Sequence, residues 1–429
     1  MKAALSVLLL SLFVVAPTHA GDWPQWRGVN RDGVLLDEPA PSKLPAKPGT
    51  LWQMPIGKGQ GGLALSKGVL IVLHEVSVNG KPMETALAIN AATGKTIWQT
   101  PYAPSWQYTN VYGPGPRTAP LVDGNLLYCQ SAAGVLACLS MDKGEVMWSK
   151  NYAKDFGAKW FGGNAPGSSG TAASRHGNNG QPVTDDKYIY VPAGGHNGSS
   201  LVCLDKQTGK LIWKSGSDYA AYSGLMLGEL AGVKQVVYVT AANMKGYRAK
   251  DGKELWSVPV KTGAARNIVT PILHENTVTV ASHTVGTFQV RISNSGDGQK
   301  AEETWRNTDV KTNITTPVLK DGFLYGLGTS RGKNSEFVCL NYKTGETAWS
   351  QRGYDDYASV IGIGDKLLVH GSRGAVTLLD ANSKEYTELS RIEAASQLTW
   401  TFPVYSQGVL YVKDGLKDGG NKLSALKLK

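Results

Sequence analysis

The sequence predicts an all-β protein, an eight-bladed β-propeller of four-stranded antiparallel blades. The main observation is a phrase that recurs along the chain: an apolar run, an Asp-like residue, two variable positions, Thr-Gly or a variant, and Trp. Its copies follow at intervals of roughly 40–50 residues, with one longer interval, and this period is typical of an array of small sheets. The composition agrees, because 51 Gly, 12 Trp and 18 Tyr suit many short strands joined by tight turns.

The clearest copy of the phrase runs from Val202 to Trp213. In this phrase the Asp can accept backbone N–H groups, the Gly supplies a positive φ in a tight hairpin, and the large Trp wedges between blades. We therefore interpret the motif as structural and not as a metal or phosphate site. The other copies end at Trp98, Trp148, Trp256, Trp305 and Trp349, and a degenerate copy ends near Leu389.

The two ends of the chain complete each other. Residues 51–55 look like a Trp strand without a preceding partner, and the C-terminal repeat, ending in residues 423–428, lacks a Trp strand. We expect the N-terminal strand to join the last blade and so close the ring. This count gives eight blades; seven remains the alternative, because the unit ending near Leu389 is degenerate.

The first 20 residues have the pattern of a secretory signal peptide. Lys2 precedes an apolar stretch that is too short to span a bilayer, and small residues at positions 16–20 predict cleavage before Gly21. Residues 21–50 then form an N-terminal extension and residues 51–429 a single propeller. We expect an exported protein, periplasmic or secreted, with no transmembrane anchor and no lipid anchor, and a monomer.

Charge and cysteines give weaker indications. The net charge of +10 is scattered, which is typical of a solvated surface, and no motif indicates nucleic acid. Cys138, Cys203 and Cys339 share one column of the repeat, as small core residues would. Cys129 and Cys138 flank a turn at residues 132–134, so a symmetric hairpin would allow a disulfide between them; two buried thiols are the alternative.

The links between blades carry the irregular, aromatic segments of the sequence. Each link joins a Trp strand to the next inner strand, so all of them lie on one face of the ring, and the longest spans residues 151–181. Aromatic, Arg and Asn side chains around a concave opening indicate a small-molecule or glycan site; the alternative is that they fill the channel and brace the loops. The candidate ligand-binding residues are Trp106, Tyr108, Tyr112, Arg117, Trp160, His176, Tyr222, Arg266, Asn267, Asn313, Tyr357 and Trp400.

Motifs that carry chemistry do not stand out in the sequence. The histidines form no His-x-His or His-Glu-x-x-His pair, and neither Gly-x-Ser-x-Gly nor Cys-x-x-Cys-His occurs. We therefore expect no metal site; the sequence leaves open whether the protein is an enzyme and favours one that is not.

The repeated phrase resembles the pyrroloquinoline-quinone-type (PQQ-like) repeat of quinoprotein alcohol dehydrogenases and of the outer-membrane assembly factor BamB. The opening Asp22–Gly33, with the segments 115–120 and 155–157, resembles exported PQQ-like proteins of planctomycete-type bacteria. The resemblance covers essentially the whole mature chain and implies an eight-bladed fold.

The resemblance also implies functions. A quinoprotein dehydrogenase would hold PQQ over adjacent cysteines and Ca²⁺ in a Glu/Asn/Asp set, but this chain has no Cys-Cys pair, and Asp355 or Asp356 could be its base only by loop position. We therefore expect no cofactor, with PQQ and Ca²⁺ as the alternative. The preferred hypothesis is a non-catalytic scaffold that binds a protein or glycan in the cell envelope. The alternatives are a PQQ-dependent dehydrogenase of alcohols or sugars and a BamB-like envelope-assembly scaffold.

Overall fold

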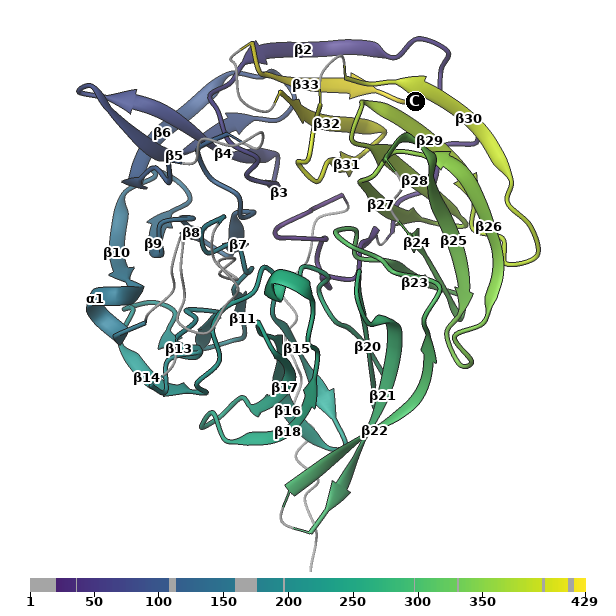
Figure 1. The fold of residues 1–429 in the computed structure, drawn as a ribbon. Coiled ribbons are helices and arrows are strands. Elements are labelled where there is room, and N and C mark those ends of the chain that lie inside the picture. Colours follow the sequence, from purple (N-terminus) through teal and green to yellow (C-terminus); the bar gives the residue numbers. More distant parts are fainter. Residues whose placement is uncertain are drawn as a thin grey trace, which may run out of the picture.

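The computed structural model describes residues 21–35, 37–107, 113–158, 176–195, 197–296, 298–329, 332–395, 398–415 and 420–429. Nearly all regular elements in these ranges are strands, arranged as a ring of blades around a central axis (Figure 1). The exceptions are the helix α1 (Tyr152–Phe156) and the 3₁₀ turns η1 (Gly263–Ala265) and η2 (Gly332–Asn334). No helix in the described ranges is long and apolar enough to cross a membrane. The predicted signal peptide lies outside the described residues.

The strands form eight sheets, so the structure confirms eight blades and not seven. Blade 1 consists of β3 (Leu63–Ser66), β4 (Val69–Val78), β5 (Lys81–Asn90) and β6 (Thr96–Pro104), and blade 2 of β7 (Leu121–Asp123), β8 (Leu126–Gln130), β9 (Val135–Ser140) and β10 (Val146–Asn151). Blade 3 consists of β11 (Val183–Thr184), β12 (Tyr188–Val191), β13 (Leu201–Asp205) and β14 (Leu211–Ser215), and blade 4 of β15 (Met226–Leu230), β16 (Val233–Val239), β17 (Asn243–Arg248) and β18 (Glu254–Pro259). Blade 5 consists of β19 (Ile272–His274), β20 (Thr277–Ser282), β21 (Gly286–Ser295) and β22 (Gly298–Asn307), and blade 6 of β23 (Val318–Lys320), β24 (Phe323–Leu327), β25 (Ser335–Asn341) and β26 (Thr347–Tyr354). Blade 7 consists of β27 (Ala358–Ile363), β28 (Lys366–Gly371), β29 (Ala375–Asp380) and β30 (Glu388–Glu393), and blade 8 of β31 (Val404–Ser406), β32 (Val409–Asp414), β33 (Lys422–Lys427) and β2 (Gly49–Pro55).

The ring closes through strands from both ends of the chain, as the sequence predicts. The N-terminal strand β2 pairs antiparallel with the C-terminal β33, and Trp52 lies opposite Ala425. β2 is the outer strand of blade 8, where it lies beside the C-terminal strands in Figure 1. Closure leaves no terminal blade with an unpaired face.

The position of a strand within its blade explains its sequence. The inner and middle strands are covered on both faces by neighbouring blades, so every residue of β8 is buried. The outer strands face solvent, and β14 has no fully buried residue. The core is therefore a ring of apolar layers between blades, and the apolar runs of the sequence mark its middle strands.

At six of the eight junctions the repeated Trp joins one blade to the next. The indole Nε1 of Trp213 donates to the carbonyl of Ala249 in the following blade at 3.1 Å, and Trp148 donates in the same way to Lys206 at 3.2 Å. The glycine of the next blade's turn lies under the ring: a Cβ on Gly252 would come within 2.6 Å of Trp213. The Asp of the phrase closes its own turn, because Asp205 Oδ1 accepts the N–H of Thr208 at 2.8 Å. These contacts agree with the structural interpretation of the motif.

Two blade junctions depart from this pattern. Trp256 donates to Gln235 Oε1 within its own blade at 2.8 Å, and Gln235 Nε2 donates to Gln299 Oε1 of the next blade at 2.7 Å. Gln299 belongs to the long β21–β22 hairpin, which has a different turn and projects from the ring in Figure 1. At the junction of blades 7 and 8, Leu389 on β30 packs against the core where other blades have Trp.

Of the two alternatives for Cys129 and Cys138, a disulfide or two buried thiols, the structure has the buried thiols. The hairpin pairs Cys129 with Ala137 and Tyr128 with Cys138, so the two cysteines lie one register step apart and face opposite sides of the sheet. All four cysteines are free and buried. Burial raises the pKa of the Cys129 thiol.

The first part of the N-terminal extension fills the centre of the ring. Residues 21–35, here called the plug, enter the channel between the inner strands (Figure 1). The backbone of Trp23 exchanges two hydrogen bonds with Leu65 of β3, and the carbonyl of Pro24 accepts the N–H of Val122 in blade 2, all at 2.8 Å. The plug ends in β1 (Val34–Leu35), which pairs in parallel with β27. The sequence predicts the extension but not its place in the channel.

Candidate functional site

A pocket of about 170 Å³ lies at the channel mouth, where the links between blades meet. This volume is close to that of a cavity of about 150 Å³ that admits one benzene ring. All eight links contribute to it, and the plug adds Trp26. The lining residues, in chain order, are Trp26, Gln60, Gly62, Arg117, Ala119, His176, Asn179, Gln181, Tyr222, Gly224, Arg266, Ile268, Thr270, Ile314, Tyr357, Trp400 and Phe402.

One side of the pocket is aromatic. Trp400 stacks on Tyr357 with 5.6 Å between ring centroids and an interplanar angle of 26°. Trp26 meets Phe402 edge to face at 5.2 Å, and its Nε1 donates to Thr270 Oγ1 at 3.3 Å. These rings come from the plug and from the links into blades 7 and 8, so three separate segments build one apolar surface.

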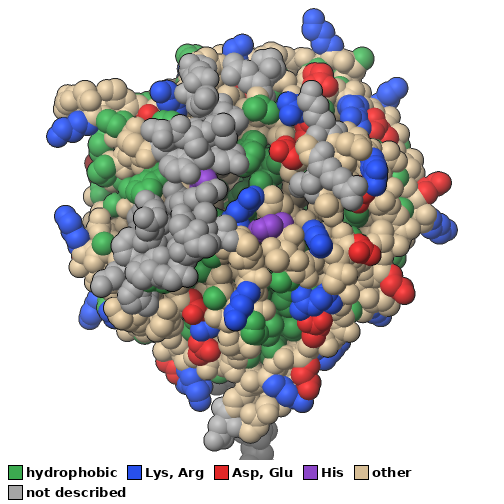
Figure 2. Space-filling view, viewed as in Figure 1, with side chains coloured by type: hydrophobic (Ala, Val, Ile, Leu, Met, Phe, Trp, Pro, Cys, Tyr) green, Lys and Arg blue, Asp and Glu red, His purple; other side chains and the backbone are tan. Residues whose placement is uncertain are grey.

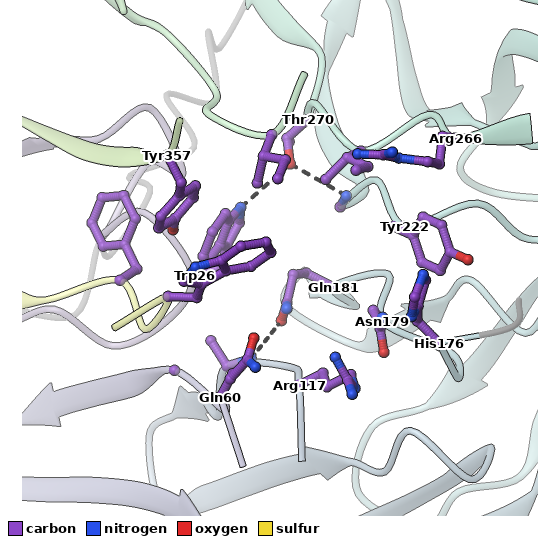
Figure 3. Close-up of a pocket in the computed structure, with 17 residues that line it drawn as sticks. Trp26, Gln60, Arg117, His176, Asn179, Gln181, Tyr222, Arg266, Thr270 and Tyr357 are labelled. Carbon is purple, nitrogen blue, oxygen red and sulfur yellow. Dashed lines mark hydrogen bonds between the residues drawn. The ribbon is translucent and has the colours of Figure 1, made fainter. Parts of the chain in front are cut away.

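The opposite side is basic and polar. Figure 3 shows Arg117, His176, Tyr222 and Arg266 across the pocket from Trp26 and Tyr357. Arg117 Nη2 donates to the carbonyl of Gly113 at 2.6 Å, and the rings of His176 and Tyr222 are 5.7 Å apart. Basic side chains and histidine also surround the central hollow of this face in Figure 2.

Amide side chains lie between the two sides. Gln181 is nearly buried, and its Oε1 accepts the backbone N–H of Ala119 at 3.0 Å (Figure 3). Asn179 and Gln60 also line the pocket. Amides both donate and accept hydrogen bonds, so this part of the wall suits hydroxyl groups.

Two buried arginines of the plug lie beside the pocket. Arg27 Nη1 donates to the carbonyl of Thr316 at 2.5 Å, and Arg31 Nη1 donates to that of Pro182 at 2.8 Å. Burial lowers the pKa of Arg27 to about 10 and that of Arg31 to about 9, so both remain charged at neutral pH. None of the described lining residues is Asp or Glu. The pocket therefore has a positive electrostatic environment.

Six of the predicted ligand-binding residues line the pocket: Arg117, His176, Tyr222, Arg266, Tyr357 and Trp400. Asn313 lies just behind it, where its Oδ1 accepts a hydrogen bond from Arg266 Nη2 at 3.0 Å. Tyr108, Tyr112 and Trp160 lie outside the described residues.

Two further candidates do not line the pocket. Asn267 is buried, and its Nδ2 donates to the carbonyls of Thr240 and Val260 at 2.9 Å, which fixes the backbone of the link. Trp106 lies near Glu84, whose Oε1 accepts its backbone N–H at 3.4 Å. The Asn267 side chain therefore serves the scaffold, whereas the contact of Trp106 with Glu84 is made by its backbone.

The sequence interpretation missed Trp26, Gln181 and Phe402. Trp26 stands in the opening phrase that marks the chain's start, yet nothing in that phrase places it in the channel. Gln181 and Phe402 lie just before the inner strands β11 and β31. At these positions the sequence does not distinguish a residue that lines the pocket from one that only connects the strands. Both lie two positions before their inner strand, and this shared position is the one regularity that could have identified them.

The described residues do not fit a calcium–PQQ centre. They contain no group of three or more His, Cys, Asp or Glu side chains that could hold a metal ion. Ca²⁺ binds oxygen ligands, usually carboxylates, and the described lining offers amide and hydroxyl oxygens but no carboxylate. Asp355 pairs with Arg373, with 3.2 Å between Oδ1 and Nε, and Asp356 Oδ1 accepts a hydrogen bond from Ser372 Oγ at 3.3 Å. Neither lines the pocket.

Comparison with known proteins gives one family. Residues 45–156 and 160–387 match the family described as outer membrane protein assembly factor BamB. No curated protein matches the chain.

Solved structures show the same fold at low identity. The computationally designed Ika8 protein has a TM-score of 0.59 and 13% identity, over 87% of this chain and 98% of that one. A europium-containing methanol dehydrogenase gives 0.51 and 11%, over 96% and 98%. The quinohemoprotein alcohol dehydrogenase ADHIIG from Pseudomonas putida HK5 gives 0.51 and 12%, over 95% and 80%. At such identities these structures support the fold alone.

Proposed function

Since the chain belongs to the family of the outer membrane protein assembly factor BamB, we propose that it is an exported, non-catalytic binding propeller of the cell envelope. Its ligand enters the pocket at the channel mouth. Of the two ligand classes that the sequence indicates, protein or carbohydrate, the pocket favours a carbohydrate.

The observation that carries this proposal is the division of the pocket into an aromatic side and a polar side, with room for about one ring. A sugar ring has apolar C–H faces and hydroxyl groups at its edge. The faces can pack on Trp400 and Trp26, and the hydroxyls can bond to Gln181 and Asn179. A protein partner would cover the wider loop face and needs no such pocket.

The proposal of a non-catalytic role follows from the same lining. General acid–base catalysis on sugars commonly uses a pair of carboxylates, and the described lining contains neither Asp nor Glu. Burial raises the pKa of the Tyr357 hydroxyl, which keeps it protonated. The remaining side chains can bind and orient a ligand.

Titration of the protein with a panel of mono- and oligosaccharides tests the proposal. We expect Trp400→Ala to weaken binding about ten-fold or more, because a buried Trp anchor commonly contributes 2 kcal/mol or more. Leu398→Ala is the matched control: Leu398 is in the same link, is 40% exposed and does not line the pocket. Wild-type protein that binds no saccharide, or Trp400→Ala that binds as wild type does, would contradict the proposal.

The family itself favours a second candidate, a scaffold in outer-membrane assembly. Such a scaffold would capture an envelope protein through the whole loop face, and Trp400→Ala alone would leave capture nearly intact. A quinone-dependent dehydrogenase would instead gain thermal stability from PQQ and Ca²⁺ through ligand linkage. We expect no such gain, because the described lining lacks carboxylates.

A further inference from the structure

The basic side chains of the pocket gather on one side of it. Arg117, His176 and Arg266 come from the links into blades 2, 3 and 5, and Figure 3 shows them on the side that faces away from Tyr357. The pocket therefore offers a ligand two ends of different chemistry, one aromatic and one positively charged.

The charge of Arg266 is held in place by a neutral partner. Its Nη2 donates to the amide oxygen of Asn313 at 3.0 Å. An amide fixes the guanidinium without neutralising it, and a guanidinium has five N–H donors, so one bond does not exhaust it. The field of Arg266 also reaches its neighbours: after burial, it is the second cause that lowers the pKa of His283.

The plug adds positive charge behind the walls. Arg31 donates to the carbonyls of Pro182 and Gln181 and to Gln25 Oε1, all of them uncharged acceptors. Its Nη2 lies 3.2 Å from the position that a Cβ on Gly224 would take, so it stands directly behind a pocket residue. Buried cations that bond only to neutral acceptors are stabilised by an anion nearby.

We propose that the ligand is an acidic saccharide, a uronic acid whose carboxylate binds on the Arg266 side while its ring packs against Trp26 and Trp400. This inference rests on the proposed function and names its ligand class. A neutral sugar would use the aromatic side and make no ionic contact with Arg266. A simple anion would do the reverse. A uronic acid uses both, and its planar carboxylate matches the guanidinium fork.

The test compares acidic and neutral sugars that differ in one group. Wild-type protein is titrated with glucuronate and glucose, and with galacturonate and galactose, at low salt. We expect the acidic member of each pair to bind at least ten-fold tighter, because hydrogen bonds to a charged group are among the strongest. Added NaCl should weaken glucuronate binding and leave glucose binding unchanged.

The Arg266→Gln variant separates the contribution of the sugar's carboxylate to binding from that of its ring. We expect this variant to bind glucuronate as weakly as glucose and to bind glucose as wild type does. Arg306→Gln is the control, since Arg306 pairs with Glu303 on the outer strand β22 and does not line the pocket. If Arg266→Gln does not fold, the salt dependence of the wild-type protein decides the question.

The outcomes distinguish this inference from the proposed function. Equal affinity for acidic and neutral sugars, still lost in Trp400→Ala, would overturn the inference and leave carbohydrate binding in place. Binding of no sugar would remove the proposed function and the inference with it. Tighter binding of benzoate or of PQQ than of glucuronate would show that the ligand is an aromatic acid, which also overturns the inference.

Discussion

The rim of the ring and its channel mouth use tryptophan in different ways. At the rim, Trp305 is nearly buried, its Nε1 donates to the carbonyl of Tyr342 at 3.0 Å, and its ring lies on Gly345 of the next blade. At the mouth, Trp400 stacks on Tyr357 and turns its remaining surface to the pocket. The rim residue packs between two blades, whereas the mouth residue lines a pocket that a ligand can enter.

The difference shows that the sequence repeat extends to the rim contacts but not to the links at the channel mouth. Most rim contacts are made with another copy of the same phrase, so the same residues recur at six of the eight junctions. Each link at the mouth occupies a different place around one pocket, so the links differ in length and residues. The account therefore assigns stability to the rim and binding to the mouth, and the following substitutions can break or sharpen this division.

The largest expected effect is that of Trp305→Ala. Removing a buried Trp should lower the free energy of unfolding by about 3–5 kcal/mol, because it leaves a cavity and an unbonded carbonyl. Urea unfolding measures it, and Trp400→Ala is the comparison, with an expected loss of about 1 kcal/mol because Trp400 is only partly buried. Equal losses in the two variants would contradict the division between rim and mouth.

Two glycines, Gly345 and Gly322, test whether the rim Trp needs a glycine under its ring. Gly345 has φ +73°, and a Cβ there would come within 2.2 Å of Trp305; Gly322 has φ +81° and nothing within 4 Å. Both Ala substitutions should cost about 1–2 kcal/mol for the left-handed backbone, and Gly345→Ala a further 1–3 kcal/mol for overpacking. Thermal or urea unfolding of both variants isolates the clash. Identical losses would mean that the Trp does not need its glycine.

A buried lysine on β32 predicts a pH dependence. Lys413 Nζ donates to the carbonyl of Leu73 at 3.0 Å, and burial lowers its pKa from 10.5 to about 7. Between these values the unfolded chain binds the extra proton, so this group makes the folded state more stable as pH rises. We expect wild type to gain about 2 kcal/mol relative to Lys413→Met between roughly pH 7 and 9. A constant difference across this range would show that Lys413 titrates normally.

The smallest expected change in stability is that of Arg266→Gln. The side chain is only partly buried and bonds to Asn313, so the free energy of unfolding should change by less than about 1 kcal/mol. Its effect on glucuronate affinity should be large. A variant that is strongly destabilised would place Arg266 among the residues that hold the links together.

The sequence predicts the rim better than the mouth, for a physical reason. A contact that recurs in most blades leaves a repeated trace, and Trp52, which closes the ring, belongs to that trace. The register of a single hairpin is not repeated, so no sequence pattern reveals it. Cys129 pairs with Ala137, and an error of one residue in the assumed turn moves a side chain to the opposite face of the sheet.

The plug shows the same limit. Arg27 and Arg31 bond to backbone carbonyls of distant links, and a carbonyl is present at every residue, so no sequence pattern marks these partners. Trp26 enters the site by the same route. Six mouth residues could be predicted because the links are irregular and aromatic; Gln181 and Phe402 could not, because their role depends on how the links converge.

The most direct test of the account is a crystal structure of the protein soaked with glucuronate. The account predicts one sugar at the channel mouth, with its ring against Trp26 and Trp400 and its carboxylate toward Arg266. A sugar bound at the rim, or one in the pocket with its carboxylate turned away from the arginines, would contradict it.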